Sequence, residues 1–144
     1  MMNKLGRSLK NRYQRGTSVV EMAIVLPLLL MLIFAIGEFG MMYTQWQSLT
    51  NAAREGARVG VVWRGTACDS TVVTTDIQNA VDQYMVNTGI DTGTITTNIN
   101  GVCGAAGTML TVTARVPYAF AAMPGLAGLQ SSINLGASST MRNE

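Results

Sequence analysis

The stretch Val19–Met42, VVEMAIVLPLLLMLIFAIGEFGMM, decides the architecture of this chain, because its residues from Met22 to Gly37 form one uncharged apolar run. A helix over residues 19–43 would be roughly 37 Å long at about 1.5 Å per residue, and the hydrocarbon core of a bilayer is about 30 Å thick. The stretch is therefore long enough to cross a membrane with some tilt. We predict a membrane-spanning helix here.

The charges before this stretch predict its orientation. Half of the ten Lys and Arg residues lie within the first fifteen positions, and no acidic residue balances them there. Basic residues beside a membrane span stay on the cytoplasmic side. We therefore expect a single-pass protein of the bacterial cytoplasmic (inner) membrane, with its N-terminus in the cytoplasm and its C-terminal hundred residues exported.

The composition argues against several classes of function. The chain has no histidine, so the commonest general base and the commonest neutral metal ligand are missing. Residues 17–144 contain five basic and eight acidic residues, and this net charge of −3 argues against nucleic-acid binding. The sequence offers no nucleophile–base pair, no calcium loop and no phosphate loop. We expect neither enzyme activity nor a cofactor nor a metal site.

Three fates of the N-terminal segment are open from the residues alone. The segment can be a secretory signal, cleaved after the small residues Ala35 and Gly37. It can also be a signal anchor that is never cut. The third alternative is a prepilin-type leader, residues 1–16, which a peptidase removes between Gly16 and Thr17 so that the apolar helix is retained.

Glu21 distinguishes the third alternative from the other two. It would be the fifth residue of the mature chain, where a charge costs about 3 kcal/mol at the bilayer centre and less near the interface. A carboxylate in this position usually has a partner. The new amino group of Thr17 in a neighbouring subunit would serve, and this pairing would fix the axial offset between packed helices. The competing interpretation is that Glu21 is solvated beside the basic cluster.

Residues 15–60, RGTSVVEMAIVLPLLLMLIFAIGEFGMMYTQWQSLTNAAREGARVG, resemble the N-terminal region of TadE-like pseudopilins of the tight-adherence (Tad, or Flp-type) pilus systems. The matching features are Arg15-Gly16, Glu21, Pro27, the Gly-Glu-Phe-Gly stretch at 37–40, and one longer block. That block, NAAREGAR, is the most specific feature. It consists of Asn51, Ala52, Ala53, Arg54, Glu55, Gly56, Ala57 and Arg58.

The resemblance implies a minor pseudopilin that takes part in the biogenesis of a thin adhesive pilus. It implies processing by the prepilin peptidase at Gly16 and Thr17, and a role for Glu21 in assembly. The expected partners are the inner-membrane Tad secretion machinery and other pilins or pseudopilins, in homo- or hetero-oligomers formed through the N-terminal helix. The protein would lie in the membrane, in the pilus or at its base. The alternative is an uncleaved, membrane-anchored extracytoplasmic binding module or adhesin.

Beyond the membrane segment, residues 17–43, the pattern predicts an amphipathic continuation of the same helix over residues 44–65. Apolar or small residues recur there at spacings of three and four, which is typical of one helix face. They are Met42, Trp46, Leu49, Ala53, Gly56, Gly60 and Trp63. We expect a kink or a locally melted turn at Pro27.

Residues 66–144 are predicted to form an extracytoplasmic α+β pseudopilin domain. A short helix is expected over Asp76–Asn87, with Thr75 and Gln78 in capping-box spacing and Gly89 as the stop. Alternating residues then predict antiparallel strands over 92–100 and 108–116, the second ended by Pro117, and a third over 132–142. The apolar stretch 118–129 would cover the sheet or lie on the membrane surface. The predicted fold is pilin-like: a long N-terminal transmembrane and amphipathic helix, a short second helix, and a small antiparallel sheet.

The two cysteines, Cys68 and Cys103, both fall in the part of the chain that we expect to be exported, where disulfides persist. We predict that they form a disulfide between the interhelix loop and the turn of the hairpin. Two free thiols, or a bond between subunits, are the alternatives.

Overall fold

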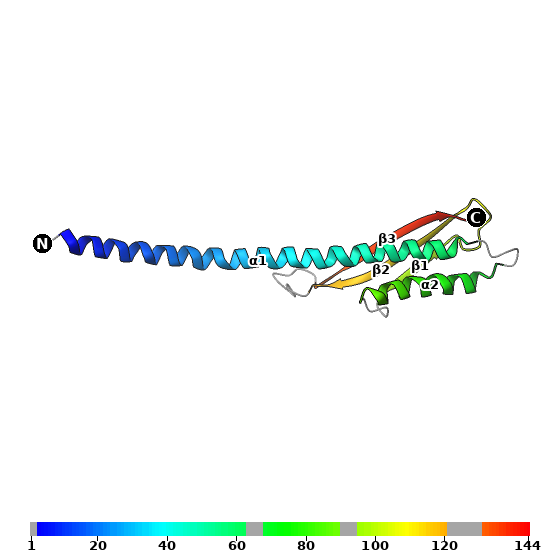
Figure 1. The fold of residues 1–144 in the computed structure, drawn as a ribbon, viewed down its shortest axis with the longest axis horizontal. Helices are drawn as coiled ribbons and strands as arrows, with labels where there is room; N and C mark the ends of the chain where they lie inside the picture. The colour runs from blue at the N-terminus through cyan, green and yellow to red at the C-terminus, as the bar shows by residue number, and fades with distance from the viewer. Residues whose placement is uncertain (1–2, 63–67, 90–94, 121–130) are drawn as a thin grey trace.

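The computed structural model describes residues 3–62, 68–89, 95–120 and 131–144, with side chains of the first helix described from Ser18 onward. Its elements follow the order helix, helix and three strands (Figure 1). They are α1 (Asn3–Gly60), α2 (Ser70–Asn87), β1 (Thr96–Asn100), β2 (Met109–Ala119) and β3 (Ser132–Arg142). The predicted α+β class, with a long N-terminal helix, a second helix and an antiparallel sheet, is confirmed.

The first helix, α1, is continuous through Pro27, so the predicted locally melted turn is wrong. A proline removes a single hydrogen bond from the helix, the one that the carbonyl of Ala23 would accept four residues earlier. Melting a turn would release several backbone groups, each costly to leave unpaired in an apolar environment. In an apolar environment, the continuous helix therefore costs less free energy than a melted turn would.

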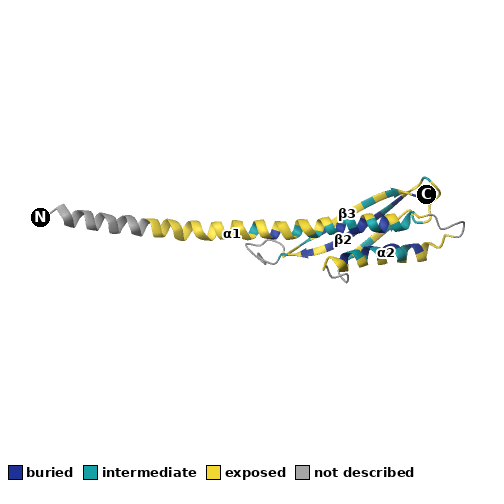
Figure 2. Ribbon diagram, viewed as in Figure 1, coloured by how far each residue is buried: buried dark blue, intermediate teal, exposed yellow. Residues whose placement is uncertain are grey.

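The two halves of α1 differ completely in their surroundings, as Figure 2 shows. The half from Ser18 to Gly37 projects from the rest of the molecule with its side chains almost entirely exposed. The half from Glu38 to Gly60 packs against α2 and the sheet. Its buried positions include Leu49, Ala52, Ala53 and Ala57. The hydrophobic core of the molecule is therefore built on the second half of the helix alone.

The three strands form an antiparallel sheet in the order β1-β2-β3. Every second residue of β2 is buried against the helices, and the intervening residues are more exposed. The buried set is Leu110, Val112, Ala114, Val116 and Tyr118. This period of two is the one expected of a sheet with one covered face.

The central strand, β2, continues through Pro117 to Ala119, so the prediction that Pro117 ends it is wrong. Pairing with β1 stops at Arg115, whereas pairing with β3 continues past Pro117, which lies opposite Asn134. A proline is tolerated in a strand that has a neighbour on only one side, because its missing N–H can point away from that neighbour. Among the described residues, the last part of β2 has β3 as its only strand neighbour.

The second helix, α2, begins at Ser70, six residues before the predicted Asp76. Its N-cap is Asp69, whose Oδ1 accepts a hydrogen bond of 2.9 Å from the backbone N–H of Thr71. Thr75 does not cap the helix; its hydroxyl donates to the carbonyl of Thr71 within it. An aspartate at the N-cap is among the best helix starts, and the additional turns bury Val73 as well.

The end of the domain opposite the N-terminus is held by covalent and polar links. Cys68 and Cys103 form the predicted disulfide, with Cα atoms 5.8 Å apart. Asn143, near the C-terminus, donates its side-chain amide to the carbonyl of Gly101 and to the hydroxyl of Thr108. Backbone bonds between Asn143 and both Gly107 and Thr108 complete the attachment. The hairpin turn therefore joins the interhelix loop to the C-terminus.

Candidate functional site

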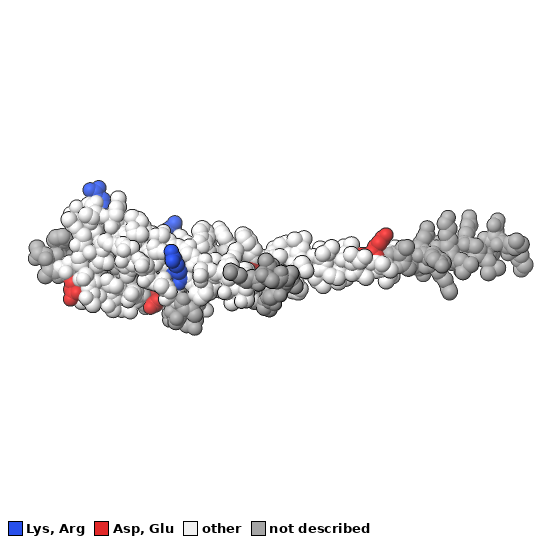
Figure 3. Space-filling model, turned by 180° about the vertical axis from the view of Figure 1, so that it is seen from behind, with Lys and Arg blue, Asp and Glu red and all other residues white. Residues whose placement is uncertain are grey.

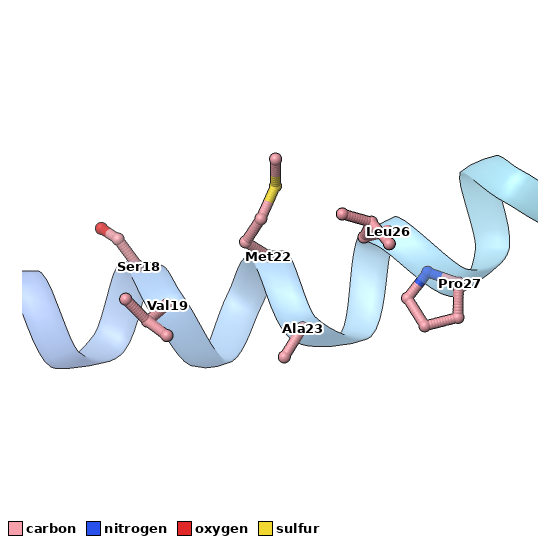
Figure 4. A pocket seen from close by; sticks show the side chains of 6 residues that line it. All are labelled: Ser18, Val19, Met22, Ala23, Leu26 and Pro27. Carbon is pink, nitrogen blue, oxygen red and sulfur yellow. The ribbon is translucent and has the colours of Figure 1, made fainter.

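Among the described residues, a surface hollow lies on the exposed half of α1. Six side chains of the helix line it: Ser18, Val19, Met22, Ala23, Leu26 and Pro27. Figure 4 shows them along a single stretch of helix, with no residue from another element among them. A hollow lined by one helix cannot enclose a substrate. Among the described residues, no three His, Cys, Asp or Glu side chains are placed to hold a metal ion.

The exposed half of α1 is an apolar rod. Its large hydrophobic side chains from Val19 to Ile36 are between 43% and 69% exposed. Each such side chain is stabilised by about 1.5–3 kcal/mol when it leaves water completely, so the rod requires an apolar environment. The described part of α1 from Ser18 is long and apolar enough to cross a membrane, consistent with a single-pass anchor. Figure 3 shows this rod as a largely uncharged surface between the domain and the N-terminal end.

Glu21 lies near the start of the rod, and its side chain is exposed. Gly16 and Thr17 lie in α1, which runs through them without a break, but their side chains are outside the described part of the helix. The carboxylate of Glu21 therefore stands on the bare surface of the helix, five positions after Gly16. The cleavage and assembly roles of these three residues stay predictions.

The NAAREGAR block, by contrast, lies in the packed half of α1. Its small residues Ala52, Ala53, Gly56 and Ala57 are buried, whereas Arg54 and Arg58 are exposed. The block thus contributes one face to the core and presents its arginines to solvent. A packing function accounts for the small residues of this block.

The glycines of this half permit close approach of α2 and the sheet to α1. A Cβ on Gly56 would lie 2.7 Å from Cγ2 of Val81. A Cβ on Gly60 would overlap Leu110 of β2 and lie 2.6 Å from Cδ1 of Ile77. Only glycine therefore fits at both positions. Glycine lowers the stability of a helix relative to alanine, and the close packing offsets this loss.

The predicted stripe of the amphipathic half is confirmed in part. Leu49, Ala53 and Gly56 are buried, and Met42 and Gly60 are partly buried. Trp46 departs from the prediction, since its side chain remains 43% exposed. Its indole Nε1 donates to the carbonyl of Gly136 in β3 at 3.3 Å. Trp63 lies outside the described residues.

The junction between the rod and the domain contains a polar pair that the sequence did not identify. Glu38 is buried, only 3% exposed, although it follows the apolar run directly. The hydroxyl of Tyr118, at the end of β2, donates to Oε1 of Glu38 at 2.6 Å. Burial, and then the bond to Glu38, raise the pKa of Tyr118 to about 12. The sequence signal was an acidic residue at the end of an uncharged run, a position that usually requires a partner.

The matched part of the chain covers both halves of α1. Residues 16–58 match the model of the TadE-like protein family. The N-terminal region of this chain is TadE-like. The recognised resemblance is thereby confirmed, and the match extends from Gly16, before the rod, to Arg58, the last residue of NAAREGAR. No curated protein and no solved structure matches the chain significantly.

The TadE-like region includes a single described ion pair on its outer surface. Arg58 Nη2 lies 2.6 Å from Oε1 of Glu55, three residues earlier on the same helix. The hydrogen bond between them lowers the pKa of Glu55 and raises that of Arg58. Because both side chains are well solvated, the pair contributes little to stability. The Glu55–Arg58 ion pair therefore does not explain why the NAAREGAR block is characteristic of the family.

The TadE-like region ends before α2, the sheet and the disulfide. The sheet meets α1 at both ends of its packed half, through Tyr118 at Glu38 and, just beyond the matched residues, through Leu110 at Gly60. The family match therefore covers the helix on which the domain is assembled, and the remaining elements are specified by residues outside the match.

Proposed function

We propose that this chain is a minor pseudopilin that takes part in the assembly of a tight-adherence pilus. The observation that carries the proposal is that one uninterrupted helix, α1, has an exposed apolar half and a half that bears the domain core. Such a helix can stay in a membrane, or among the helices of other subunits, while it holds an exported domain in a fixed position. The TadE-like match over residues 16–58 supports the pilus context.

The proposed orientation places the basic N-terminal residues in the cytoplasm and the domain outside it. The Cys68–Cys103 disulfide supports this orientation, because disulfides persist in oxidising compartments. The proposed partners are the inner-membrane secretion machinery, the prepilin peptidase and other pilins or pseudopilins. We propose no catalytic role for the chain itself.

The proposed maturation is cleavage between Gly16 and Thr17, which leaves the rod at the N-terminus of the mature chain. Glu21 would then be its fifth residue, exposed on the bare helix and able to meet the amino group of a neighbouring Thr17. A charge held away from water is costly when its partner is missing. The contact would therefore favour the one axial offset between subunits that brings the carboxylate and the amino group together.

The processing test is the N-terminal sequence and intact mass of the membrane-bound protein. We expect the wild-type chain to start at Thr17, and Gly16→Leu to leave the leader attached, because the peptidase must accommodate the residue before the cut. Gly6→Leu, a glycine substitution inside the leader, is the matched control and should be processed normally. A chain that starts at Glu38 would make this a freely secreted protein, and an uncut wild-type chain would favour the anchored binding module.

The assembly test compares Glu21→Ala with Glu144→Ala, which removes an exposed carboxylate at the far end of the domain. We expect both variants to reach the membrane in normal amounts. Only Glu21→Ala should reduce the number of pili on cells, counted by electron microscopy. Normal piliation in the Glu21→Ala strain would contradict the pairing role of this carboxylate.

A further inference from the structure

Three aromatic side chains form an exposed ladder on α1 directly after the apolar rod. Phe39, Tyr43 and Trp46 are 62%, 48% and 43% exposed. Their spacings of four and three residues place them on one helix face. The ring centroids of Phe39 and Tyr43 are 6.4 Å apart, and those of Tyr43 and Trp46 are 6.0 Å apart. We call these three residues the aromatic ladder; neither the domain core nor the proposed assembly contact uses their exposed faces.

The surface around the ladder carries no exposed charge from α1. Between Glu21 and Arg54, Glu38 is the only charged residue in the sequence. Its carboxylate is enclosed, with 3% exposure and the Tyr118 hydroxyl bonded to it. The uncharged surface of the rod therefore continues along the helix past Glu38 to the ladder, even though an acidic residue lies between them.

The length of each part fits one layer of a bilayer. The rod, Ser18–Gly37, is roughly 30 Å long at about 1.5 Å per residue, which equals the thickness of the hydrocarbon core. The ladder occupies the next roughly 10 Å of helix, comparable with the headgroup layer on one side. Tyr and Trp are enriched in that layer, because each combines an apolar ring with a polar group.

We propose that the aromatic ladder docks in the outer headgroup layer of the membrane that α1 spans, with Glu38 carried beside that layer in a form enclosed by Tyr118. The membrane-proximal end of the domain is then seated in the lipid interface. Trp46 links this anchor to the sheet through its bond to Gly136, so the ladder also fixes the tilt of the domain against the membrane. The proposal rests on the membrane anchoring in the proposed function, but not on pilus assembly.

The experiment uses the full chain in phosphatidylcholine–phosphatidylglycerol vesicles whose acyl chains carry bromine either near the headgroup or near the methyl end. Trp63→Phe leaves Trp46 as the only tryptophan, since the chain contains two. Bromine quenches indole fluorescence only on contact. We expect shallow bromine to quench Trp46 at least about twofold more strongly than deep bromine, as for a residue at the interface.

The matched control moves the single tryptophan to the other end of the domain. Val62→Trp, in a chain with Trp46→Phe and Trp63→Phe, places an indole at an exposed position just beyond the C-terminal end of α1. Neither lipid should quench it. Absence of quenching of Trp46 by both lipids would overturn the proposal. So would shallow quenching that disappears as the protein-to-lipid ratio rises, because a second copy would then cover the ladder.

The role of Tyr118 is tested in the same vesicles. Tyr118→Phe removes the hydroxyl that donates to the buried carboxylate of Glu38. The carboxylate then draws water to the junction, and we expect the shallow quenching of Trp46 to fall by about half. Tyr84→Phe, which removes the hydroxyl of a tyrosine on α2, should leave the quenching unchanged. Adding Glu38→Gln to Tyr118→Phe removes the charge and should restore the quenching. If Tyr118→Phe folds, by circular dichroism, and still gives wild-type quenching, the enclosing role of Tyr118 is wrong. Normal piliation of a strain that lacks this protein, together with quenched Trp46 in the vesicles, would contradict the proposed function and leave the docking intact.

Discussion

The two halves of α1 have the same backbone conformation and opposite surroundings. From Ser18 to Gly37 the helix buries almost nothing, and from Glu38 to Gly60 it carries the core of the domain. Apart from Glu21 near its start, the first half is apolar on all sides, as expected of a helix that could span a membrane. The second half concentrates small residues on one side, as required of a helix that must accept both a second helix and a sheet.

The glycines of α1 show what this difference means for a single residue type. Gly37 and Gly40 have no other atoms within 4 Å of the position where a Cβ would lie, whereas Gly56 and Gly60 are in tight contact there. Glycine therefore has no packing role in the middle of α1, and it has an essential packing role near the C-terminal end of the helix.

The largest effect is expected from removing the disulfide. Cys103→Ser should lower the free energy of unfolding of the domain by about 3 to 4 kcal/mol, because the bond closes a loop of thirty-odd residues in the unfolded chain. Hydrogen exchange in vesicles should show loss of protection in α2 and the sheet. The amides of Ser18–Gly37 should stay protected, since the membrane holds that half independently. Loss of protection in both halves would show that the helix behaves as one cooperative unit.

The second prediction applies one substitution to both halves of the helix. Gly60→Val should destabilise the domain by about 2 kcal/mol, because the new side chain would overlap Leu110 and Ile77. Gly37→Val, with open space around its Cβ, should change the stability by less than about 0.5 kcal/mol. Urea unfolding of the detergent-solubilised chain measures both values. Equal effects at the two positions would contradict the assigned packing.

The third prediction concerns the junction between the halves. The pKa of Tyr118 is raised from 10.0 to about 12 by burial and by its bond to Glu38. The folded state therefore keeps a proton that the unfolded state releases first, so this contribution to stability is complete below pH about 10 and is lost as pH rises towards about 12. Denaturation at increasing pH should show this decline in the wild type. In Tyr118→Phe, stability should be about 1–2 kcal/mol lower at neutral pH and should decline less in this window.

The control for the third prediction is Tyr43→Phe, which removes a phenol that lies on the exposed ladder. Its profile in the same window should match that of the wild type. A wild-type profile in Tyr118→Phe would show that the hydroxyl bond to Glu38 contributes nothing to the junction.

Several features of the molecule were determined by the sequence alone. The uncharged run from Met22 to Gly37 requires an apolar environment in any fold that leaves it uncovered, and the alternation along residues 109–118 suits only a sheet with one covered face. A chain with only two cysteines left few possible disulfides. These predictions succeeded because each depends only on the chemistry of the residues and on their spacing in the sequence, and not on contacts between distant parts of the chain.

Other features were decided only by the tertiary structure. Nothing local to Glu38 reveals that a tyrosine eighty residues later will enclose it. Thr75 and Asp69 are both acceptable helix caps, and the additional burial of Val73 against the core favours the earlier start. Pro117 ends a strand in most contexts, and it continues one here because β2 keeps its pairing with β3 past this residue. In each case the free energy of the local conformation depends on a residue that is distant along the chain. Only the folded structure brings that residue into contact.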